Sequence, residues 1–409
     1  MTASPSPRSA AALARFGLLP DDQPAPYTPD PHHTRHLAQS IASRIADRRA
    51  RVVLLTGPSG AGKSTLLRAL PDHLRERRIH PIHLDALPLR DEPVVDLFDS
   101  SLDETLRCLA HAGLAEAALF ARTPSQLSDG QRTRLRIALA LDLARRRPRE
   151  PCALLADEFL HALDRPTARS VAITLRRAVL STTNLSLIAA TAHDDMTHPL
   201  QPDHHLALDL GDLAAPSTLA LAEAPPPPAD HFTIATAPFS AYLALARFHY
   251  RAAPPATRPL TLAAHDAASG VLVGALVVSM PTLNAAWRAL AWPGRYSPPS
   301  REATRRLNEE VRCISRVVVD PRFRARGAAT ALIRHYLDNP LTIHTEAVAA
   351  MGRACPIFTR AGMTEHILPP RAQDERLLHV LSTLRIPRSR LATPSALLRR
   401  LDADKRHTL

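Results

Sequence analysis

The first half of the chain alternates short apolar runs with longer amphipathic stretches. Three mainly apolar runs have the length of strands and lie at Val52–Leu55, Cys152–Ala156 and Leu185–Ala192. Runs with little polar alternation are typical of strands buried on both faces of a sheet. The stretches between them have apolar residues at helical spacing, as in 36–49, where Leu37 and Ile41 share one face. This pattern predicts parallel strands connected by helices, an α/β fold.

A proline-rich segment separates this half from a second one. It includes four consecutive prolines, which cannot continue a helix or a central strand. Beyond it, strand-like runs such as FTIATA and CISRVVVD alternate with helical stretches, as in an α+β or α/β domain. We therefore expect a flexible lead-in over 1–30, a first domain over 31–210, a linker over 211–231, a second domain over 232–366 and a basic helical extension over 367–409.

A candidate phosphate-binding loop follows the first apolar run. The sequence GPSGAGKST has the spacing G-x-x-x-x-G-K-[ST], in which glycines let backbone N–H groups turn towards phosphate oxygens. The next helix presents its positive end to the same anion. The lysine reaches the β- and γ-phosphates, and a hydroxyl binds Mg²⁺. The residues expected to bind ATP are Gly57, Ser59, Gly60, Ala61, Gly62, Lys63, Ser64 and Thr65, with Ser64 also a ligand of Mg²⁺.

Composition strengthens this interpretation. Three of the 13 glycines lie within 57–62. Lys63 is one of only two lysines among 51 basic residues, the other being Lys405. A chain that uses arginine almost everywhere thus has a lysine where a compact ammonium must fit among phosphates. We therefore expect nucleotide binding at this loop.

The formal net charge of +12 is unevenly distributed. Residues 1–210 hold 26 of the 51 basic and 24 of the 39 acidic side chains, so +10 of the excess lies in residues 211–409. Such a balance indicates an anionic partner, and nucleic acid bound through this basic half is one candidate. The other explanation is a general enrichment in arginine, because aromatic residues, at 4%, are few for stacking on bases.

Other features limit the class of protein. No apolar run approaches the roughly 18–20 residues of a membrane helix, and the N-terminus lacks the apolar core of a secretory signal. Four scattered cysteines indicate buried thiols in a reducing cytosol. The histidines His32, His33, His36, His80 and His83 have no Cys or carboxylate at metal-site spacing. We expect a cytoplasmic protein without membrane contact.

Four further motifs follow the phosphate-binding loop in a fixed order. LSDGQ starts a helix, Asp157 and Glu158 end an apolar strand, Asp164 follows in HALD, and His193 ends a later strand. An acid at a strand end can hold Mg²⁺, and an adjacent carboxylate can orient the attacking water. Asp157 and Glu158 are the candidates for these roles. His193 is the candidate for contact with the γ-phosphate.

This order of motifs resembles that of the ABC-type ATPases, in which Walker A, signature, Walker B, D-loop and H-loop follow one another. The resemblance covers about residues 30–210. It implies a P-loop NTPase fold and a homodimer with ATP sandwiched between two copies, where the signature of one copy contacts ATP held by the other. The signature and D-loop residues implied are Ser128, Gly130, Gln131 and Asp164.

The chain departs from the ABC-type pattern in three places. The one glutamine between Lys63 and Leu127, Gln126, lies too late to be the usual Q-loop residue. Three acids are alternatives to it: Asp85, Glu92 and Asp103. Phe159 replaces the usual proline after the Walker B glutamate. A clear aromatic residue for stacking on adenine is missing, and Tyr27 is the one candidate for that role.

The second half contains another candidate phosphate-binding loop. In VVVDPRFRARGAATAL a strand leads into Arg324–Ala329, where small residues let backbone amides approach a pyrophosphate at a helix start. This resembles the R-x-x-G-x-[GA] loop of GNAT acetyltransferases, and PIFTRAGM resembles a later part of that domain. The resemblance covers about residues 231–365 and implies an α+β acyltransferase-like domain that binds acetyl-CoA. The cofactor-binding residues implied are Val317, Val319, Arg324, Arg326, Gly327, Ala328 and Ala329.

Acetyl transfer itself has fewer candidate residues. Phe358 lies in the region where a tyrosine often acts as general acid in that superfamily. Deprotonation of an ammonium acceptor needs a carboxylate or a chain of waters. The possible bases are Glu309, Glu310 and Glu346.

The two halves together resemble ABC-type ATPases fused to a predicted acetyltransferase domain. We expect Mg²⁺-dependent ATP hydrolysis in a sandwich dimer, coupled to an appended domain that binds acetyl-CoA and acts on an unknown acceptor. One alternative is an ATPase associated with nucleic acid, in DNA maintenance or RNA modification. Another is the nucleotide-binding subunit of an ABC transporter.

Overall fold

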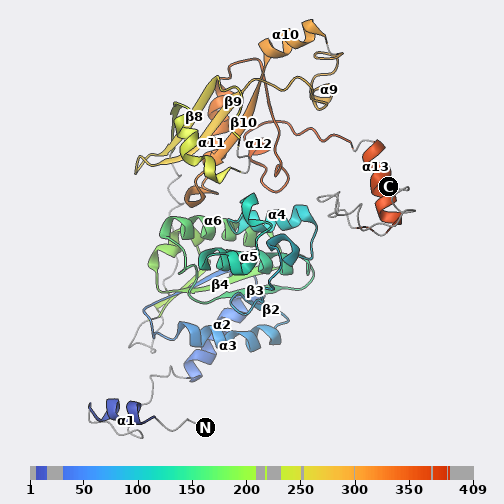
Figure 1. Ribbon diagram of the computed structural model, residues 1–409. Coiled ribbons are helices and arrows are strands. Elements are labelled where there is room, and N and C mark those ends of the chain that lie inside the picture. Colours follow the sequence, from blue (N-terminus) through green and yellow to red (C-terminus); the bar gives the residue numbers. More distant parts are fainter. Residues whose placement is uncertain are drawn as a thin grey trace. The chain divides into compact units, whose positions relative to one another are not determined.

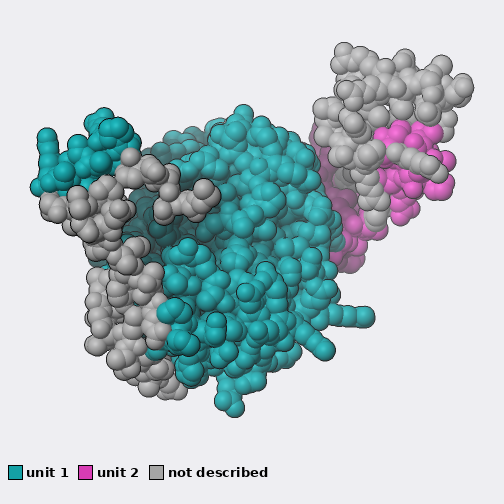
Figure 2. All heavy atoms as spheres, turned by 90° about the horizontal axis from the view of Figure 1, so that it is seen from below, with its two compact units in different colours: residues 1–280, 312–362 teal, residues 281–311, 363–409 magenta. Residues whose placement is uncertain are grey.

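The computed structural model divides into two compact units. Unit 1 comprises Met1–Met280 and Arg312–Gly362, and unit 2 comprises Pro281–Val311 and Met363–Leu409 (Figure 2). The residues described are 6–15, 31–208, 217–218, 232–249, 253–298, 300–369, 372–384 and 386. These residues form two sheets, and both are built almost entirely from unit 1.

The first sheet has six strands in the order β2-β3-β4-β1-β5-β6. Their bounds are β1 Val52–Thr56, β2 His80–His83, β3 Cys152–Ala156, β4 Leu185–Thr191, β5 His204–Ala207 and β6 Ser217–Thr218. Strand β1 pairs in parallel with β4 and β5, and β3 pairs in parallel with β2 and β4. Strand β6 runs antiparallel at the edge beside β5. The expected α/β architecture of the first half is confirmed.

Helices cover both faces of this sheet (Figure 1). Their bounds are α2 Pro31–Ala46, α3 Lys63–Glu76, α4 Leu102–His111, α5 Asp129–Arg145, α6 Arg165–Ser181 and α7 Thr197–Leu200. Val53 and Leu55 of β1 pack in one core with α2 and α3, whereas Val52 and Leu54 pack in another with α4, α5 and α6. Alternate residues of one strand point to opposite faces, so a continuous apolar run supplies both cores.

The second sheet has five strands in the order β11-β10-β9-β8-β7. Their bounds are β7 Phe232–Thr236, β8 Leu260–Asp266, β9 Leu272–Ser279, β10 Val311–Val319 and β11 His344–Ala347. Strands β7 to β10 form an antiparallel meander. Helices α8 (Ser240–Leu245), α11 (Ala328–Asp338) and α12 (Ile357–Arg360) accompany it. Tyr242 and Leu245 of α8 pack with Val277 of β9, which makes this an α+β arrangement.

The remaining elements are short or lie in unit 2. Unit 2 contains α9 (Arg288–Ala291), α10 (Arg301–Glu310) and α13 (Ala372–Thr383). The 3₁₀ helices are η1 Val94–Leu97, η2 Ala117–Leu119, η3 Pro124–Gln126, η4 Asp194–Met196, η5 Ala246–Phe248 and η6 Pro321–Phe323. No helix in the described part of the chain is long and apolar enough to cross a membrane.

The structure adds detail at the expected domain borders. Within 1–30, a helix α1 covers Pro7–Ala14 and has no buried residue. Within 211–231, Ser217–Thr218 pair with β5, and the four prolines lie outside the described residues. The expected borders between domains stay predictions. Cys108 and Cys152 are buried, and all four cysteines are free thiols.

Candidate functional site: two candidate phosphate-binding loops

The loop between β1 and α3 has the backbone of a phosphate cradle. Gly57 has φ +145°, and a Cβ there would lie 2.1 Å from the carbonyl oxygen of Leu208. Gly62 has φ +88° and caps the start of α3, whose first residue is Lys63. Only glycine adopts these conformations without strain, which explains why the motif has glycine at both positions. Ser59 and Gly60 are exposed on the same loop, and Thr65 follows in α3.

Lys63 lies inside this loop and close to two carboxylates. Its Nζ donates to the carbonyl oxygens of Gly57 at 2.6 Å and Pro58 at 2.7 Å. Burial lowers the pKa of Lys63, and the negative charges of Asp157 and Glu158 oppose that shift. The structure therefore places the Walker B carboxylates near the lysine, as the order of motifs predicts.

The sheet order explains this proximity. Strand β4 lies between β1 and β3, and all three are parallel, so their carboxyl ends meet at one edge. Asp157 directly follows β3, and its Oδ1 accepts from the N–H of Glu158 at 3.0 Å. His193 follows β4, and its N–H donates to Thr191 Oγ1 at 3.1 Å. Ligand sites in open α/β sheets lie at this edge.

The side chain of Glu158 is available for chemistry. It is 73% exposed and lies 3.5 Å from the imidazole of His161. Its backbone has φ +42°, an unusual conformation for a residue other than glycine. His193 is also exposed, so it is not a core histidine.

The oxygen donors near the loop suit Mg²⁺ bound together with a nucleotide. Ser64 is half-buried in the first turn of α3, and Asp157 ends β3. A hydroxyl and a carboxylate are hard oxygen ligands, and Mg²⁺ usually completes its shell with water and substrate phosphates. No group of three or more His, Cys, Asp or Glu in the described chain could hold a metal by itself. The histidines noted in the sequence therefore form no such cluster among these residues.

The signature turn is partly exposed at the start of α5. Ser128 and Asp129 are exposed, and Gly130 is buried, where a Cβ would lie 2.6 Å from Leu163 Cδ2. Ser128 Oγ accepts from the N–H of Gln131 at 3.3 Å, and Gln131 Oε1 accepts from the N–H of Ser128 at 3.0 Å. This capping box fixes the turn.

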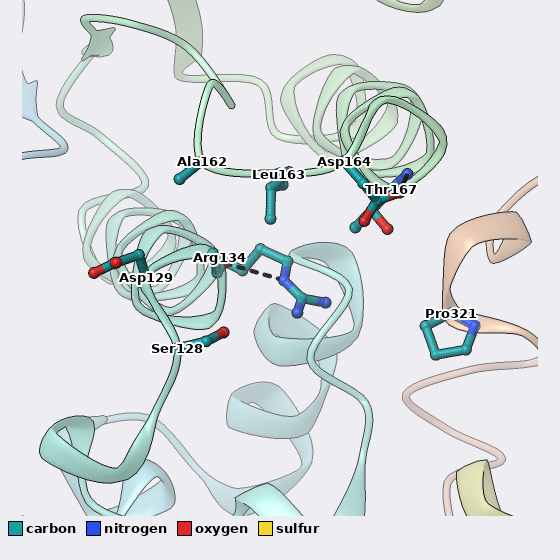
Figure 3. Close-up of a pocket in the computed structure, with 9 residues that line it drawn as sticks. Ser128, Asp129, Arg134, Ala162, Leu163, Asp164, Thr167 and Pro321 are labelled. Carbon is teal, nitrogen blue, oxygen red and sulfur yellow. Dashed lines mark hydrogen bonds between the residues drawn. The ribbon is translucent and has the colours of Figure 1, made fainter.

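The D-loop lies against this turn. Asp164 caps α6 and accepts from the N–H of Thr167 at 3.0 Å. A cavity of about 390 Å³ lies between the two segments and is lined by Ser128, Asp129, Gly130, Arg134, Ala162, Leu163, Asp164, Thr167 and Pro321. Figure 3 shows the guanidinium of Arg134 pointing from α5 towards the side where Pro321 lies. Contact of this turn with a nucleotide stays a prediction.

One of the three acids proposed for the missing Q-loop glutamine lies at the carboxyl edge of the sheet. The N–H of Leu84 donates to the carbonyl oxygen of Leu155, which extends the β2–β3 pairing to the residue before Asp85. Glu92 instead pairs with Arg90 at 3.4 Å. Gln126 Oε1 accepts from the N–H of Thr123. Asp103 pairs with Arg353 at 3.4 Å, and Tyr27 lies outside the described residues.

The second candidate phosphate-binding loop has its arginines in ion pairs. Arg324 Nη1 lies 3.1 Å from Glu116 Oε1, and Arg326 Nη2 lies 3.4 Å from Asp266 Oδ1. Gly327 has φ +96° and caps α11. Ala328 and Ala329 form the first turn of that helix, whose amides are the donors predicted to meet a pyrophosphate. Val317 and Val319 lie on β10 beside it.

The candidate bases have different surroundings. Glu310 Oε2 accepts from Arg295 at 2.7 Å and from Tyr296 at 2.9 Å. The hydrogen bond from Arg295 lowers the pKa of Glu310, which favours a fixed anion over a base. Glu309 is exposed beside Arg305, and Glu346 is buried in β11. Phe358 lies in α12.

Comparison with known proteins gives matches in the ATPase half. The family model described as AAA ATPase domain matches residues 32–188. The aliphatic sulfonates import ATP-binding protein SsuB of Delftia acidovorans is 35% identical over 206 residues, which cover 46% of this chain and 80% of that protein. The sulfate/thiosulfate import ATP-binding protein CysA of Salmonella typhi is 29% identical over 164 residues, 31% of this chain and 42% of that protein.

The chain spans less than half the length of the first curated relatives that it matches. Among solved structures, the dimeric structure of MJ0796, a bacterial ABC transporter cassette, is 21% identical and aligns with a TM-score of 0.30, covering 39% of this chain and 82% of that one. The match to the Delftia protein, at 35% identity over four fifths of its length, shows the family. This chain belongs to the ABC-type ATPases.

Proposed function

We propose that the chain binds ATP with Mg²⁺ at the loop 57–65 and hydrolyses it between two copies of the chain. The observation that carries the proposal is the meeting of Lys63 with Asp157 and Glu158 at one sheet edge. His193 follows β4, the strand that lies between β1 and β3. Lys63 at the start of α3 and the carboxylate pair after β3 supply the positive charge, the Mg²⁺ ligand and the water-positioning group that phosphoryl transfer to water uses.

Each group has one role in this proposal. Mg²⁺, held by Ser64 and Asp157, would neutralise charge on the phosphates. Lys63 would leave the carbonyl oxygens of the loop and bind phosphate oxygens instead. Glu158, exposed beside the loop, would accept a hydrogen bond from the attacking water and orient it. His193 would bind the terminal phosphate group.

The dimer follows from the exposed signature turn. Ser128 and Asp129 are exposed to solvent at the start of the capped helix α5. A hydroxyl and a helix N-terminus favour the binding of an anion there. By resemblance to the family, that anion is ATP held by the second copy. Asp85, which follows β2 at the same edge as Asp157, is our candidate for the missing Q-loop glutamine.

For the second sheet we propose binding of acetyl-CoA, with transfer to an unknown acceptor as a further step. The start of α11, with Gly327, Ala328 and Ala329, supports this half of the proposal. Calorimetry with acetyl-CoA tests it, and no heat at high micromolar ligand would reduce the domain to a scaffold. Labelled acetyl-CoA incubated with cell extract would identify the acceptor class by mass spectrometry.

The alternative with a specific observation behind it is a transporter subunit. The curated relatives are named import ATP-binding proteins, and SsuB matches over most of its length. Co-purification with a membrane permease would favour this function. A nucleic-acid role through the basic half remains a weaker proposal, and stimulation of ATPase activity by DNA at moderate salt is its test.

A further inference from the structure

An arginine-rich cavity of about 520 Å³ lies within unit 1. One wall is formed by the segment from η6 to the start of α11 and by α12, and the other by α4, α5 and α6. No Asp or Glu lines it. The arginines that line it are Arg107, Arg134, Arg177, Arg324, Arg353 and Arg360. Three of them also pair with acids that do not line the cavity, Arg107 with Glu104, Arg324 with Glu116 and Arg353 with Asp103. A lining with six arginines and no acid is suited to an anionic ligand.

Two of these arginines retain donors for a ligand. Arg134 is only 9% exposed, and its Nε and Nη1 donate to the carbonyl oxygens of Gly130 and Gly113. Its Nη2 makes no hydrogen bond within the described chain, although the residue lines the cavity. The guanidinium of Arg360 likewise donates to no described residue. Donors left over in a cavity are available to phosphate oxygens.

His111 also lines the cavity. Burial, followed by the charges of Arg145 and Arg107, lowers the pKa of His111 to about 4. The imidazole is therefore neutral near pH 7 and can accept as well as donate. The positive potential belongs to the arginines alone.

The loop of the second sheet is fixed to the ATPase helices around this cavity. Ser170 Oγ of α6 donates to the carbonyl oxygen of Arg322 at 2.7 Å. Arg177 Nη1, also of α6, donates to the carbonyl oxygen of Ala325 at 2.6 Å. The pair of Arg324 with Glu116 adds a third contact. Both walls are therefore held in place by side chains that the ATPase half supplies.

We propose that this cavity binds a ligand that contains a pyrophosphate, and that Arg107 and Arg177 of the ATPase helices complete the site opposite the start of α11. The apolar part of the wall, with Val319, Phe323 and Ile357, fits the remainder of a nucleoside-diphosphate compound. Coenzyme A and free nucleoside diphosphates share this chemistry. The new element is the contribution of α4 and α6, which goes beyond the proposed binding of acetyl-CoA by the second sheet.

The cavity is connected to the signature turn of the ATPase through one residue, Arg134. Arg134 lines this cavity and also the cavity beside the signature turn. Its Nε holds the carbonyl oxygen of Gly130 in that turn. A ligand that accepts a hydrogen bond from Nη2 of Arg134 would therefore alter the signature turn, which contacts ATP in the proposed dimer. This part rests on the proposed ATPase function.

Binding is tested by calorimetry on the full chain carrying Lys63→Ala, which weakens nucleotide binding at the loop 57–65. The probes are coenzyme A, ADP and inorganic pyrophosphate. We expect Arg107→Gln and Arg177→Gln each to raise the Kd at least about tenfold, because each removes a charge-assisted contact. Arg360→Gln tests the opposite wall. Arg35→Gln, an exposed arginine on α2, is the matched control and should leave the Kd unchanged.

The probes separate the ligand classes. Tighter binding of coenzyme A than of ADP assigns the site to an acyl carrier, and the reverse assigns it to a free nucleotide. If coenzyme A binds equally well to the Arg107→Gln and Arg177→Gln variants, the composite site is wrong while acetyl-CoA binding by the second sheet stands. If none of the probes binds, the composite site and acetyl-CoA binding by the second sheet are both wrong. The ATPase proposal is tested separately by the ATP turnover of the Lys63→Ala variant.

The ATPase readout tests the coupling. With Lys63 intact, we expect the better probe to change the steady-state ATPase rate at least about twofold, and this response should be absent in Arg107→Gln. Arg134→Lys keeps the charge but loses the fork that binds Gly130 and reaches the cavity. It should bind the probe yet lose the response. A response retained in Arg134→Lys would overturn the assigned path.

Discussion

Arg324 and Glu116 form an ion pair of 3.1 Å, in which both side chains are about four-fifths buried. The pair joins the loop after η6 to the segment after α4 across 208 residues of sequence. Burial lowers the pKa of Arg324, and Glu116 opposes this shift. Removing one partner leaves the other charge buried and unpaired, which costs more than the pair contributes.

We therefore expect Glu116→Gln to lower the free energy of unfolding by about 1–3 kcal/mol. The double variant Glu116→Gln with Arg324→Gln should recover part of this loss, because neither position is then charged. Denaturant unfolding of the wild type, the two single variants and the double variant measures the cycle. Losses in the two single variants that simply add in the double variant would show that the pair does not form.

Lys63→Ala should reduce ATP turnover roughly 10²–10³-fold, because it removes one preorganised positive charge at the phosphates. Arg75→Ala, on the same helix α3, is the matched control and should retain the rate. A phosphate-release assay with Mg²⁺-ATP measures both. Unchanged turnover in Lys63→Ala would remove the assignment of the loop.

Glu158→Gln should lower turnover roughly 10²–10⁴-fold, since the neutral amide is a weaker hydrogen-bond acceptor than the carboxylate that orients the attacking water. ATP binding should survive, so this variant should elute as a dimer in size-exclusion chromatography with ATP and as a monomer without it. Glu150→Gln, an exposed glutamate paired with Arg147, should behave as the wild type. A Glu158→Gln variant that stays monomeric with bound ATP contradicts the sandwich dimer.

Ser128 and Ser101 both cap helices, which allows stability and function to be separated. Ser128 Oγ accepts from Gln131 N–H, and Ser101 Oγ accepts from Glu104 N–H. Replacement of either serine by alanine should cost about 1 kcal/mol of stability. Only Ser128→Ala should also abolish ATP-dependent dimerisation. Equal turnover in the two variants would exclude the signature serine from the site.

Gly57 and Gly270 both have positive φ but differ in the space around them. A Cβ at Gly57 would lie 2.1 Å from the carbonyl oxygen of Leu208, whereas none of the atoms near Gly270 lies within 4 Å of such a Cβ. Gly57→Ala should cost at least about 2 kcal/mol from strain and clash together, and Gly270→Ala about 1 kcal/mol from strain alone. Thermal unfolding of both variants distinguishes these values.

His111 should make stability fall in mild acid. Its pKa in the folded chain is about 4, below the ordinary value of 6.5, so the unfolded chain binds the proton first. The loss begins as the pH falls below about 6.5 and is complete near pH 4, reaching roughly 3 kcal/mol. His111→Gln should remove this part of the slope. Denaturation midpoints at pH 7.5 and pH 5 give the comparison, and identical slopes would contradict it.

The sequence was sufficient for features that depend on neighbouring residues. The glycine loop before Lys63, the capping box of Ser128 and Gln131, and the apolar strands follow from local backbone preference and periodicity. The order of motifs then placed Asp157 and Glu158 near Lys63, because parallel strands bring their carboxyl ends together. The family was recognisable for the same reason.

The sequence was not sufficient for contacts between distant segments. The resemblance to the GNAT loop implies that Arg324 and Arg326 bind a pyrophosphate, yet each has a carboxylate partner, Glu116 and Asp266, that no local pattern indicates. The cavity lined by α4, α6 and the start of α11 is likewise invisible in the sequence. Spacing along the chain fixes which backbone amides and side chains a loop presents. Which charges face that loop is decided by packing between helices and sheets far apart in sequence, because burial compels each charge to find a partner.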